Sequence, residues 1–396
     1  MTQPQIYNKE YLMAAGPTPL PPAVSQVMAN PIPYHRAPAF MEIHERALGN
    51  LRKVFQTDNE VLSFASSGTG ALESAVANLL FPGDVAAVAS AGKFGERWAD
   101  LCRSYCVDLT HLDLEWGDRI DGEAIDRMLS SMDQTPRAVF ATLSETSTGV
   151  VHDVRGIAEA AREHGTIAVI DAISGLAAAD LPQDDWGVDV VISGSQKALM
   201  APPGLAFASV SEKAMALAAE REGNRFYFDW GRTAKGQAQS PPSSPFTPAV
   251  TLWLALDVAL QQILEEGLPQ VFERHAILAR AARAGVDGLG LERFGVQFEG
   301  SNVVTAAHLP ETIDGAQVPK LMRDSYGVTA AGGQNDLKGK IVRIAHCGYF
   351  GAFDILISLT ALENSLRDLG YEVEPGTAAA AAQRVFVEAG SPAPVG

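Results

Sequence analysis

The stretch RAVFATLSETSTGVVHDVRGIAEAAREHGTIAVIDAI, residues 137–173, decides the fold class of this chain. It holds two runs that are apolar almost throughout, at 137–145 and 166–173. Between them, residues 156–165 show helical spacing and end at Gly165, where a left-handed cap would lie. Strands that are apolar on both faces and are joined by helices are typical of a parallel sheet covered on both sides. The stretch therefore predicts a three-layer α/β/α domain.

The same alternation continues on both sides of this stretch. Because most strands are separated by helical patterns, the sheet is expected to be mixed but mostly parallel. The further strand-like runs lie at 61–65, 85–90, 188–195 and 205–211, and the further helical patterns at 71–80 and 95–105.

A smaller α+β domain is expected at the C-terminal end. A Pro/Ser-rich stretch at 240–245 interrupts the alternation, and a long helical pattern at 249–267 is expected to begin the exit from the large domain. Strand-like runs then lie at 303–309 and 341–346, with helical patterns near 317–325 and 353–369. The predicted parts are an N-terminal arm (1–22), a large domain (23–262), a small domain (263–375) and an Ala-rich tail (376–396) that is poorly tied down.

The composition argues against two classes of partner. The 396 residues include 30 Lys or Arg and 47 Asp or Glu, which gives a formal net charge of −17. Because binding to a phosphate backbone needs a surplus of basic side chains, no nucleic-acid partner is expected. The apolar runs are too short to span a membrane, and no secretory signal pattern is visible. Three cysteines do not make a disulfide framework, so we expect a cytoplasmic protein.

No metal site is predicted. Cys102 and Cys106 are four residues apart in an expected helix, so we expect them to share one buried face rather than to bind a metal. The eight histidines show no ligand spacing. His35, in PYHRAPAF (33–40), either helps to close a pocket or has a structural role.

Ser66-Ser67-Gly68-Thr69-Gly70 lies between an expected strand and an expected helix. Small residues let a ligand approach the backbone, and the free N–H groups of a helix start favour an anion, above all a phosphate. The stretch is neither a Walker loop nor a dinucleotide fingerprint. A tight strand-to-helix corner without a ligand is the alternative interpretation.

Asp171 lies at the end of one apolar strand run, and Lys197 lies just after another. Asp171 is either a turn residue or a carboxylate kept to hold a cationic ring nitrogen. Lys197 is either a solvated turn residue or an amine that loses its charge by desolvation and forms an imine. An anion cradle, a buried acid and a strand-end lysine are together what pyridoxal 5′-phosphate requires, so we expect that cofactor.

The chain resembles the class V aminotransferases of the alanine/serine–glyoxylate (serine–pyruvate) group, which have the fold called type I. The resemblance implies this α/β fold and pyridoxal-phosphate-dependent chemistry. It is carried by AGPTPLPP (15–22), SSGTGALE (66–73), GKFGERW (92–98), ETSTGV (145–150), DAISGL (171–176), SGSQKALMAPPG (193–204), FTPAV (246–250) and GKIVRIAHCG (339–348).

The resemblance also implies roles for single residues at the cofactor. Lys197 would form the Schiff base and move a proton, and Asp171 would hold the pyridine nitrogen, as the two catalytic residues. Phe94 would stack on the ring, and Thr146 would lie near its 3′-oxygen. The remaining residues implied for cofactor binding are Ser67, Gly68, Thr69, Gln196 and Thr247.

At the substrate, the resemblance implies Gly16 and Arg343. Arg343 would clamp the α-carboxylate with two N–H groups, although an exposed strand arginine is the alternative interpretation. Thr247 would reach the phosphate of a neighbouring subunit, which implies a homodimer with shared sites.

The expected activity is transamination between alanine or serine and glyoxylate or pyruvate by a ping-pong mechanism. Relatives that accept aspartate, 2-aminoethylphosphonate or pyridoxamine stay open as alternatives, as does a protein that keeps the fold without catalysis. A cysteine desulfurase or lyase is disfavoured, because those enzymes stack a His where this chain has Phe94, and because Cys347 is expected to be a packing residue.

Overall fold

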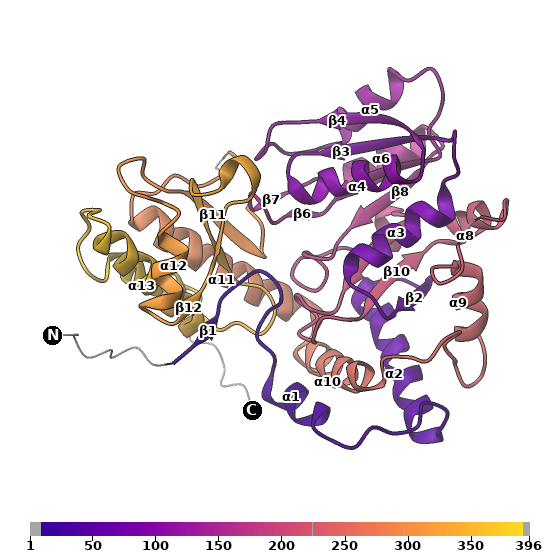
Figure 1. The fold of residues 1–396 in the computed structure, drawn as a ribbon, viewed down its shortest axis with the longest axis horizontal. Helices are drawn as coiled ribbons and strands as arrows, with labels where there is room; N and C mark the ends of the chain where they lie inside the picture. The colour runs from indigo at the N-terminus through magenta and orange to yellow at the C-terminus, as the bar shows by residue number, and fades with distance from the viewer. Residues whose placement is uncertain (1–8, 224, 296, 299, 391–396) are drawn as a thin grey trace.

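The computed structural model describes residues 9–390 apart from 224, 296 and 299. The ends of the predicted arm (1–8) and tail (391–396) lie outside the described residues. The chain forms a larger α/β part, indigo to salmon in Figure 1, and a smaller part built mainly from the orange and yellow C-terminal segments.

A seven-stranded sheet forms the centre of the larger part. Every strand is parallel to the others except β10, which lies antiparallel to both its neighbours. The mixed, mostly parallel sheet expected from the apolar runs is thereby confirmed. In spatial order its strands are β2 (Glu60–Phe64), β10 (Ala206–Val210), β9 (Val190–Gly194), β8 (Ile167–Asp171), β5 (Ala138–Thr142), β3 (Val85–Ser90) and β4 (Asp108–Asp113).

Helices cover both faces of this sheet, because side chains alternate between the faces along each strand. In β5, for example, Val139 lies in the core on one side and Phe140 in the core on the other. One side is covered by α3 (Gly68–Leu79), α4 (Lys93–Ser104), α8 (Glu212–Ala219) and α9 (Trp230–Gln237). The opposite side is covered by α1 (Pro22–Met28), α2 (Pro38–Phe55), α5 (Gly122–Ser130), α6 (Val154–Glu163), α7 (Gln183–Trp186) and α10 (Val250–Glu266).

In the described residues, the smaller part combines short sheets with four α-helices and a 3₁₀ helix. Strand β1 (Tyr11–Leu12), from the N-terminal segment, runs parallel to β12 (Val328–Thr329) in this part. The three-stranded antiparallel sheet consists of β11 (Val304–His308), β14 (Ile341–Ala345) and β13 (Ala331–Gly332). Around them lie α11 (Leu268–Gly288), α12 (Val318–Asp324), η1 (Asn335–Leu337), α13 (Ala352–Asp368) and α14 (Thr377–Glu388).

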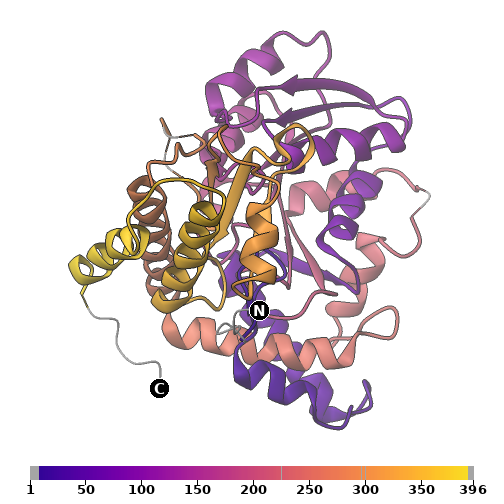
Figure 2. The ribbon, with the colours of Figure 1, turned by 60° about the vertical axis from the view of Figure 1, so that its left-hand side comes forward.

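Two expectations about the chain ends and cysteines are wrong. For the described part of the tail, the expected weak attachment is wrong: α14 packs beside α11 and α13, and the three helices lie together in Figure 2. Cys102 and Cys106 do not share a face: α4 ends at Ser104, and Cys106 is exposed with a φ of 55°. The turn rotates Cys106 away from the buried side of the helix.

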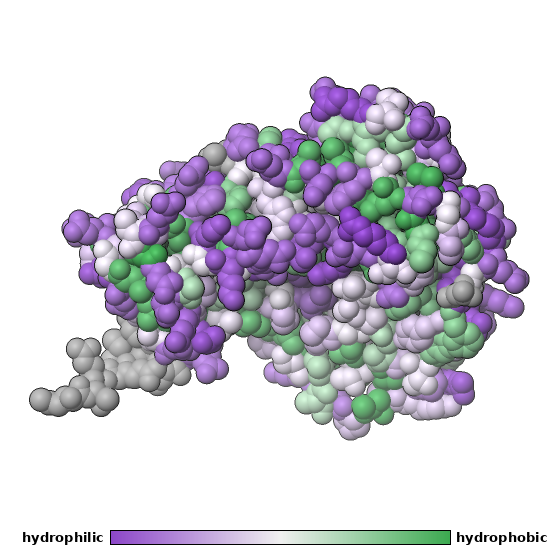
Figure 3. Space-filling view, turned by 45° about the horizontal axis from the view of Figure 1, so that its top comes forward, coloured by the Kyte–Doolittle hydropathy of each residue, from purple (hydrophilic) through white to green (hydrophobic). Residues whose placement is uncertain are grey.

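The helix expected at 249–267 is α10, and it packs on α1 and α2 of the larger part. The next helix, α11, is the one that enters the smaller part, while the exact domain bounds stay a prediction. Among the described residues, no helix is long and apolar enough to cross a membrane. Hydrophilic side chains spread across the middle of the face shown in Figure 3, with hydrophobic ones in scattered patches.

Candidate active site

The candidate site lies where the parallel strands end. Asp171 is the last residue of β8, and Lys197 follows β9 by three residues. The loop at 66–70 follows β2, which is parallel to both strands. Because the carboxyl ends of parallel strands meet at one edge, these groups converge there, as ligand sites do in open α/β sheets.

Lys197 is held by the N-terminal segment on one side. The backbone N–H of Thr18 donates to the carbonyl of Gln196 at 3.1 Å, and the Thr18 hydroxyl donates to the carbonyl of Lys197 at 3.1 Å. Gly16 lies against the lysine side chain, since a Cβ there would come within 2.6 Å of Cδ. Burial lowers the pKa of Lys197, so more of the nucleophilic neutral amine is present than in a solvated lysine.

Asp171 is a buried carboxyl group in the same place. The N–H of Ile173 donates to its Oδ1 at 2.8 Å. Burial raises the pKa of Asp171 to about 6, while this hydrogen bond and the charges of Arg97 and Lys197 act in the opposite direction. A buried acid that is costly to ionise alone is suited to face a cationic ring nitrogen.

The loop that was expected to cradle a phosphate forms the start of α3. Ser67 is the N-cap residue, and none of the described side chains caps this helix start. Gly68 fits against Ile173, because a Cβ at position 68 would meet Cγ1 of that side chain at 2.9 Å. Arg97 donates to the Thr69 hydroxyl at 3.3 Å, so its positive charge lies beside the backbone N–H groups at the start of α3. The arrangement favours an anion.

Arg343, on β14, is brought to the same site from the smaller part. Its Nε donates to the carbonyl of Gly332 at 2.9 Å, and its Nη1 donates to the carbonyl of Thr146 at 2.9 Å. The residue is only 9% exposed, and burial lowers its pKa. The interpretation as an exposed strand arginine is therefore wrong, and the guanidinium is oriented with N–H groups left for a ligand.

Several buried polar atoms in the segments that precede Lys197 and contact Arg343 lack a partner among the described residues: Thr146 Oγ1, Ser193 Oγ and Gln196 Oε1. Such atoms are costly unless a ligand or water satisfies them. A polar, anionic ring compound with several acceptors and donors fits them, and Phe94 offers an aromatic face, its ring centroid 5.9 Å from Lys197 Nζ. The residues present therefore fit pyridoxal phosphate.

Two further residues named from the sequence are Thr247 and Cys347. Thr247 is exposed and lines an open cavity of about 460 Å³ together with His35 and Phe40. Cys347 is fully buried near Lys197, and burial raises its pKa to about 11, so its thiol stays protonated. This placement agrees with a packing role for Cys347.

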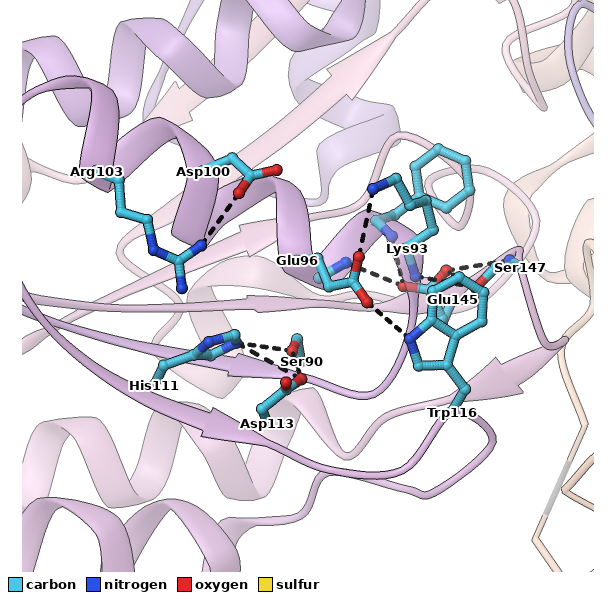
Figure 4. A network of polar contacts seen from close by, with 12 residues as sticks. Ser90, Lys93, Glu96, Asp100, Arg103, His111, Asp113, Trp116, Glu145 and Ser147 are labelled. Carbon is cyan, nitrogen blue, oxygen red and sulfur yellow. Dashed lines mark hydrogen bonds and ion pairs between the residues drawn. The ribbon is translucent and has the colours of Figure 1, made fainter. Parts of the chain in front are cut away.

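Two residues of the site escaped the sequence interpretation. The Arg97 guanidinium lies 5.1 Å from the centroid of the Phe94 ring. Its position three residues after Phe94 on the same helix is the sequence feature that could have predicted this contact. Glu145, on the hairpin of β6 (Ser144–Glu145) and β7 (Val150–Val151), accepts hydrogen bonds at the start of α4 (Figure 4). Its motif, ETSTGV, carries part of the family resemblance, which implies a role only for Thr146.

Comparison with known sequences gives a consistent result. A family described as "Aminotransferase class-V" matches residues 10–343. A protein named soluble hydrogenase, small subunit, from Synechococcus sp. is 39% identical, with 96% of this chain and 99% of that protein covered. A serine–glyoxylate aminotransferase from Hyphomicrobium methylovorum is 35% identical (95% and 94% covered). An L-aspartate–glyoxylate aminotransferase from Paracoccus denitrificans is 34% identical (94% and 94% covered).

Solved structures agree over nearly the whole chain. The ureidoglycine–glyoxylate aminotransferase of Bacillus subtilis superposes with a TM-score of 0.91 at 30% identity, covering 98% of this chain and 99% of that one. The pyridoxamine–pyruvate aminotransferase of Mesorhizobium loti also gives 0.91, at 27% identity, with 98% and 100% covered.

Proposed function

The chain belongs to the class V aminotransferases, which depend on pyridoxal phosphate, and we propose that it transfers an amino group from alanine or serine to glyoxylate or pyruvate. The proposal rests mainly on one observation. Lys197 and Asp171 lie at the carboxyl edge of the large sheet, and Arg343 of the smaller part contributes to the same site. An amine, an acid and a carboxylate clamp are the groups that amino-acid chemistry on this cofactor requires.

Lys197 and Asp171 are proposed as the catalytic residues. When bound, pyridoxal phosphate acts as an electron sink for the bond that breaks at the substrate Cα. Lys197 would hold the cofactor through its amine and, as a general base, would move the proton from the substrate Cα to C4′ of the cofactor. Asp171 holds the ring nitrogen in its protonated form, since an anion beside a cation offsets the cost of burying either one.

The remaining groups bind and orient. Ser67, Gly68 and Thr69 at the start of α3, with Gln196, are proposed to bind the phosphate, and Phe94 to cover the ring face. The Thr146 hydroxyl, which lacks a described partner, is suited to the oxygen on the ring.

Arg343 is proposed to bind the substrate α-carboxylate. Two backbone carbonyls already fix its plane, so little side-chain entropy is lost when a carboxylate arrives. Gly16, which lies against Lys197, leaves space beside the amine where any side chain would intrude.

The substrates are proposed from the named relatives. Glyoxylate appears in the names of the serine and aspartate enzymes and of the ureidoglycine enzyme, which supports glyoxylate as acceptor. Serine as donor is supported in the same way, and aspartate is the alternative. Transfer in two half-reactions, with the donor product leaving before the acceptor binds, predicts ping-pong kinetics.

A homodimer with shared sites is also proposed. The support is that Thr247 is exposed and lines the 460 Å³ cavity, which leaves its hydroxyl open to a ligand of a second subunit. The cytoplasmic location inferred from the cysteine content stays a prediction.

A donor and acceptor panel tests the proposed function. Each amino acid is added alone to the cofactor-loaded protein, and the visible absorbance of the cofactor reports the first half-reaction. We expect serine or alanine to change the spectrum, and glyoxylate or pyruvate to restore it. Release of sulfide from cysteine would indicate a desulfurase, and a spectrum that no amino acid changes would indicate a protein without this catalysis.

A further inference from the structure

The β6–β7 hairpin carries a buried carboxylate that has no assigned role in the transfer. Glu145 is 0% exposed. Its Oε2 accepts hydrogen bonds from the backbone N–H groups of Phe94 and Gly95, both at 3.0 Å. Its Oε1 accepts from the N–H and the hydroxyl of Ser147, at 3.1 and 2.5 Å. Because all four partners donate, these contacts favour the ionised carboxylate and lower the pKa of Glu145, whereas burial, the larger effect, raises it.

These bonds replace the usual cap of α4. The N-cap residue, Gly92, has no side chain to accept a hydrogen bond. The N–H of Lys93 donates to Ser147 Oγ at 3.1 Å, so the hairpin satisfies the amides at 93–95. A Cβ at position 92 would lie 2.6 Å from Cδ of Glu145, so the approach requires glycine. The anion also interacts favourably with the positive end of the helix dipole.

The hairpin thereby fixes two parts of the site at once. The first turn of α4 carries Phe94, whose ring centroid lies 5.9 Å from Lys197 Nζ and 5.1 Å from the Arg97 guanidinium. The residue after Glu145 is Thr146, whose carbonyl holds Arg343. In Figure 4, Glu145 lies at the start of the helix beside Ser147, while Glu96 on the helix itself points toward Lys93 and Trp116.

We propose that Glu145 is a positioning residue that caps α4 from the neighbouring hairpin and so fixes the Phe94 ring against the plane of the bound cofactor. The inference rests on the proposed function, because it takes Phe94 as the residue that covers the cofactor ring. The charge of Glu145 also acts on the site directly: it contributes to the raised pKa of Asp171, after the larger effect of burial.

The substitution Glu145→Gln tests this role. Glutamine keeps the size but replaces one accepting oxygen by an NH₂ group that faces N–H donors. We expect pyridoxal phosphate to bind about 10- to 100-fold more weakly in an equilibrium titration. Hydrogen–deuterium exchange of the amides at 94 and 95 should become faster in the cofactor-free protein.

Glu96→Gln is the matched control, because it is the same substitution in the same helical turn. The Glu96 carboxylate contacts side chains, Lys93 Nζ at 3.3 Å and Trp116 Nε1 at 2.8 Å, rather than the amides of the helix start. We expect wild-type affinity for pyridoxal phosphate in this variant.

A double-mutant cycle with Phe94→Ala separates positioning from general destabilisation. If Glu145 acts through Phe94, its substitution should weaken binding much less when the ring is already absent. Additive losses, or wild-type affinity and exchange in Glu145→Gln, would overturn the proposal.

A second variant covers the case in which Glu145→Gln does not fold. Ser147→Ala removes the hydroxyl that joins Glu145 to the Lys93 amide, and it should speed exchange at 93–95. Unchanged exchange there would also refute the cap. Failure of the wild-type chain to bind pyridoxal phosphate would refute the proposed function. The cap would still be tested, because the exchange experiment is done without cofactor.

Discussion

Arg343 Nη1 donates a 2.9 Å hydrogen bond to the backbone carbonyl of Thr146, 197 positions earlier in the chain. The bond joins β14 of the smaller part to the β6–β7 hairpin at the edge of the large sheet. A second bond, from Nε to the carbonyl of Gly332, leaves the guanidinium little freedom to rotate. The site is thus assembled from both parts of the molecule, and the orientation of the Arg343 guanidinium depends on their contact.

Arg343→Lys and Arg343→Ala should both weaken binding of the amino acid. An ammonium group cannot make both carbonyl bonds and still present two N–H groups to a carboxylate. Losing a charge-assisted pair costs about 3 kcal/mol, so we expect KM for the amino donor to rise about 100-fold, with a smaller change in kcat. Steady-state kinetics provide the test, with Arg323→Ala on the exposed face of α12 as the control. An unchanged KM would contradict the clamp.

Lys197→Ala should abolish transamination. The variant lacks the amine that we propose attaches the cofactor and moves the proton, so we expect turnover to fall by about 10⁴-fold or more. Borohydride reduction followed by peptide mapping should fix the cofactor on the peptide that contains residue 197 in the wild type but not in Lys197→Ala. Lys53→Ala, on the exposed side of α2, is the control and should keep full labelling. Labelling of another lysine would refute the assignment.

Asp171→Asn should stabilise the cofactor-free protein at high pH. Burial raises the pKa of Asp171 from 3.8 to about 6, so folding favours its protonated form. The stability this provides is complete below about pH 4 and is lost as the pH rises through about 6, a cost of about 3 kcal/mol. Asparagine does not ionise, so its thermal midpoint should exceed that of the wild type at pH 8.

The gap between the two proteins should close as the pH falls toward 4, and thermal unfolding at several pH values measures it. Added pyridoxal phosphate should reverse the order at pH 8, because the ionised acid then faces a cationic ring nitrogen. A gap that does not change between pH 4 and 8 would contradict the burial of this carboxyl group.

The sequence predicted the parts of the site that follow strands. Asp171 and Lys197 come directly after apolar runs, and parallel strands bring such positions to one edge whatever the details of the loops. Glu145 could not be assigned in the same way, because its role depends on a short hairpin folding back on a helix 50 residues earlier. Contacts of this kind depend on the angle of a turn, which single-sequence patterns do not specify.

Composition alone gave wrong or missing predictions for the helices in Ala-rich and Pro-rich segments. The alanine-rich composition after Pro375 predicts a weakly held tail, yet its small side chains allow α14 to pack closely on α11 and α13. Helices α1 and α2 were not predicted, because their Pro-rich and polar surroundings hide the helical spacing. Both begin with proline in the first turn, a favourable position for it.

Gly16→Ala should impair the site without unfolding the protein. The residue has a φ of 130°, which is strained for alanine, and a Cβ there would lie 2.9 Å from Lys197 Nζ. We expect kcat/KM to fall at least about tenfold, because the lysine must move from its place. Gly49→Ala, on α2 with open space around its Cβ, is the matched control and should keep wild-type kinetics. Equal kinetics in both variants would contradict the close approach at residue 16.

Ala382→Glu should destabilise the protein, whereas Ala380→Glu should not. The Ala382 side chain is fully buried between α14 and its neighbours, and Ala380 is exposed on the same helix.

The close contact depends on glycines in α11: a Cβ at Gly285 would meet the Ala378 carbonyl at 3.1 Å, and one at Gly288 would meet the Ala381 Cβ at 3.1 Å. The buried Glu363 carboxylate also accepts from the N–H of Gly376 at 2.5 Å, which anchors the start of the helix. Because an unpaired charge would be buried at 382, we expect a loss of about 3 kcal/mol in urea unfolding, against almost none at 380. Equal midpoints for the two variants would mean that α14 does not pack on α11 and α13 in solution.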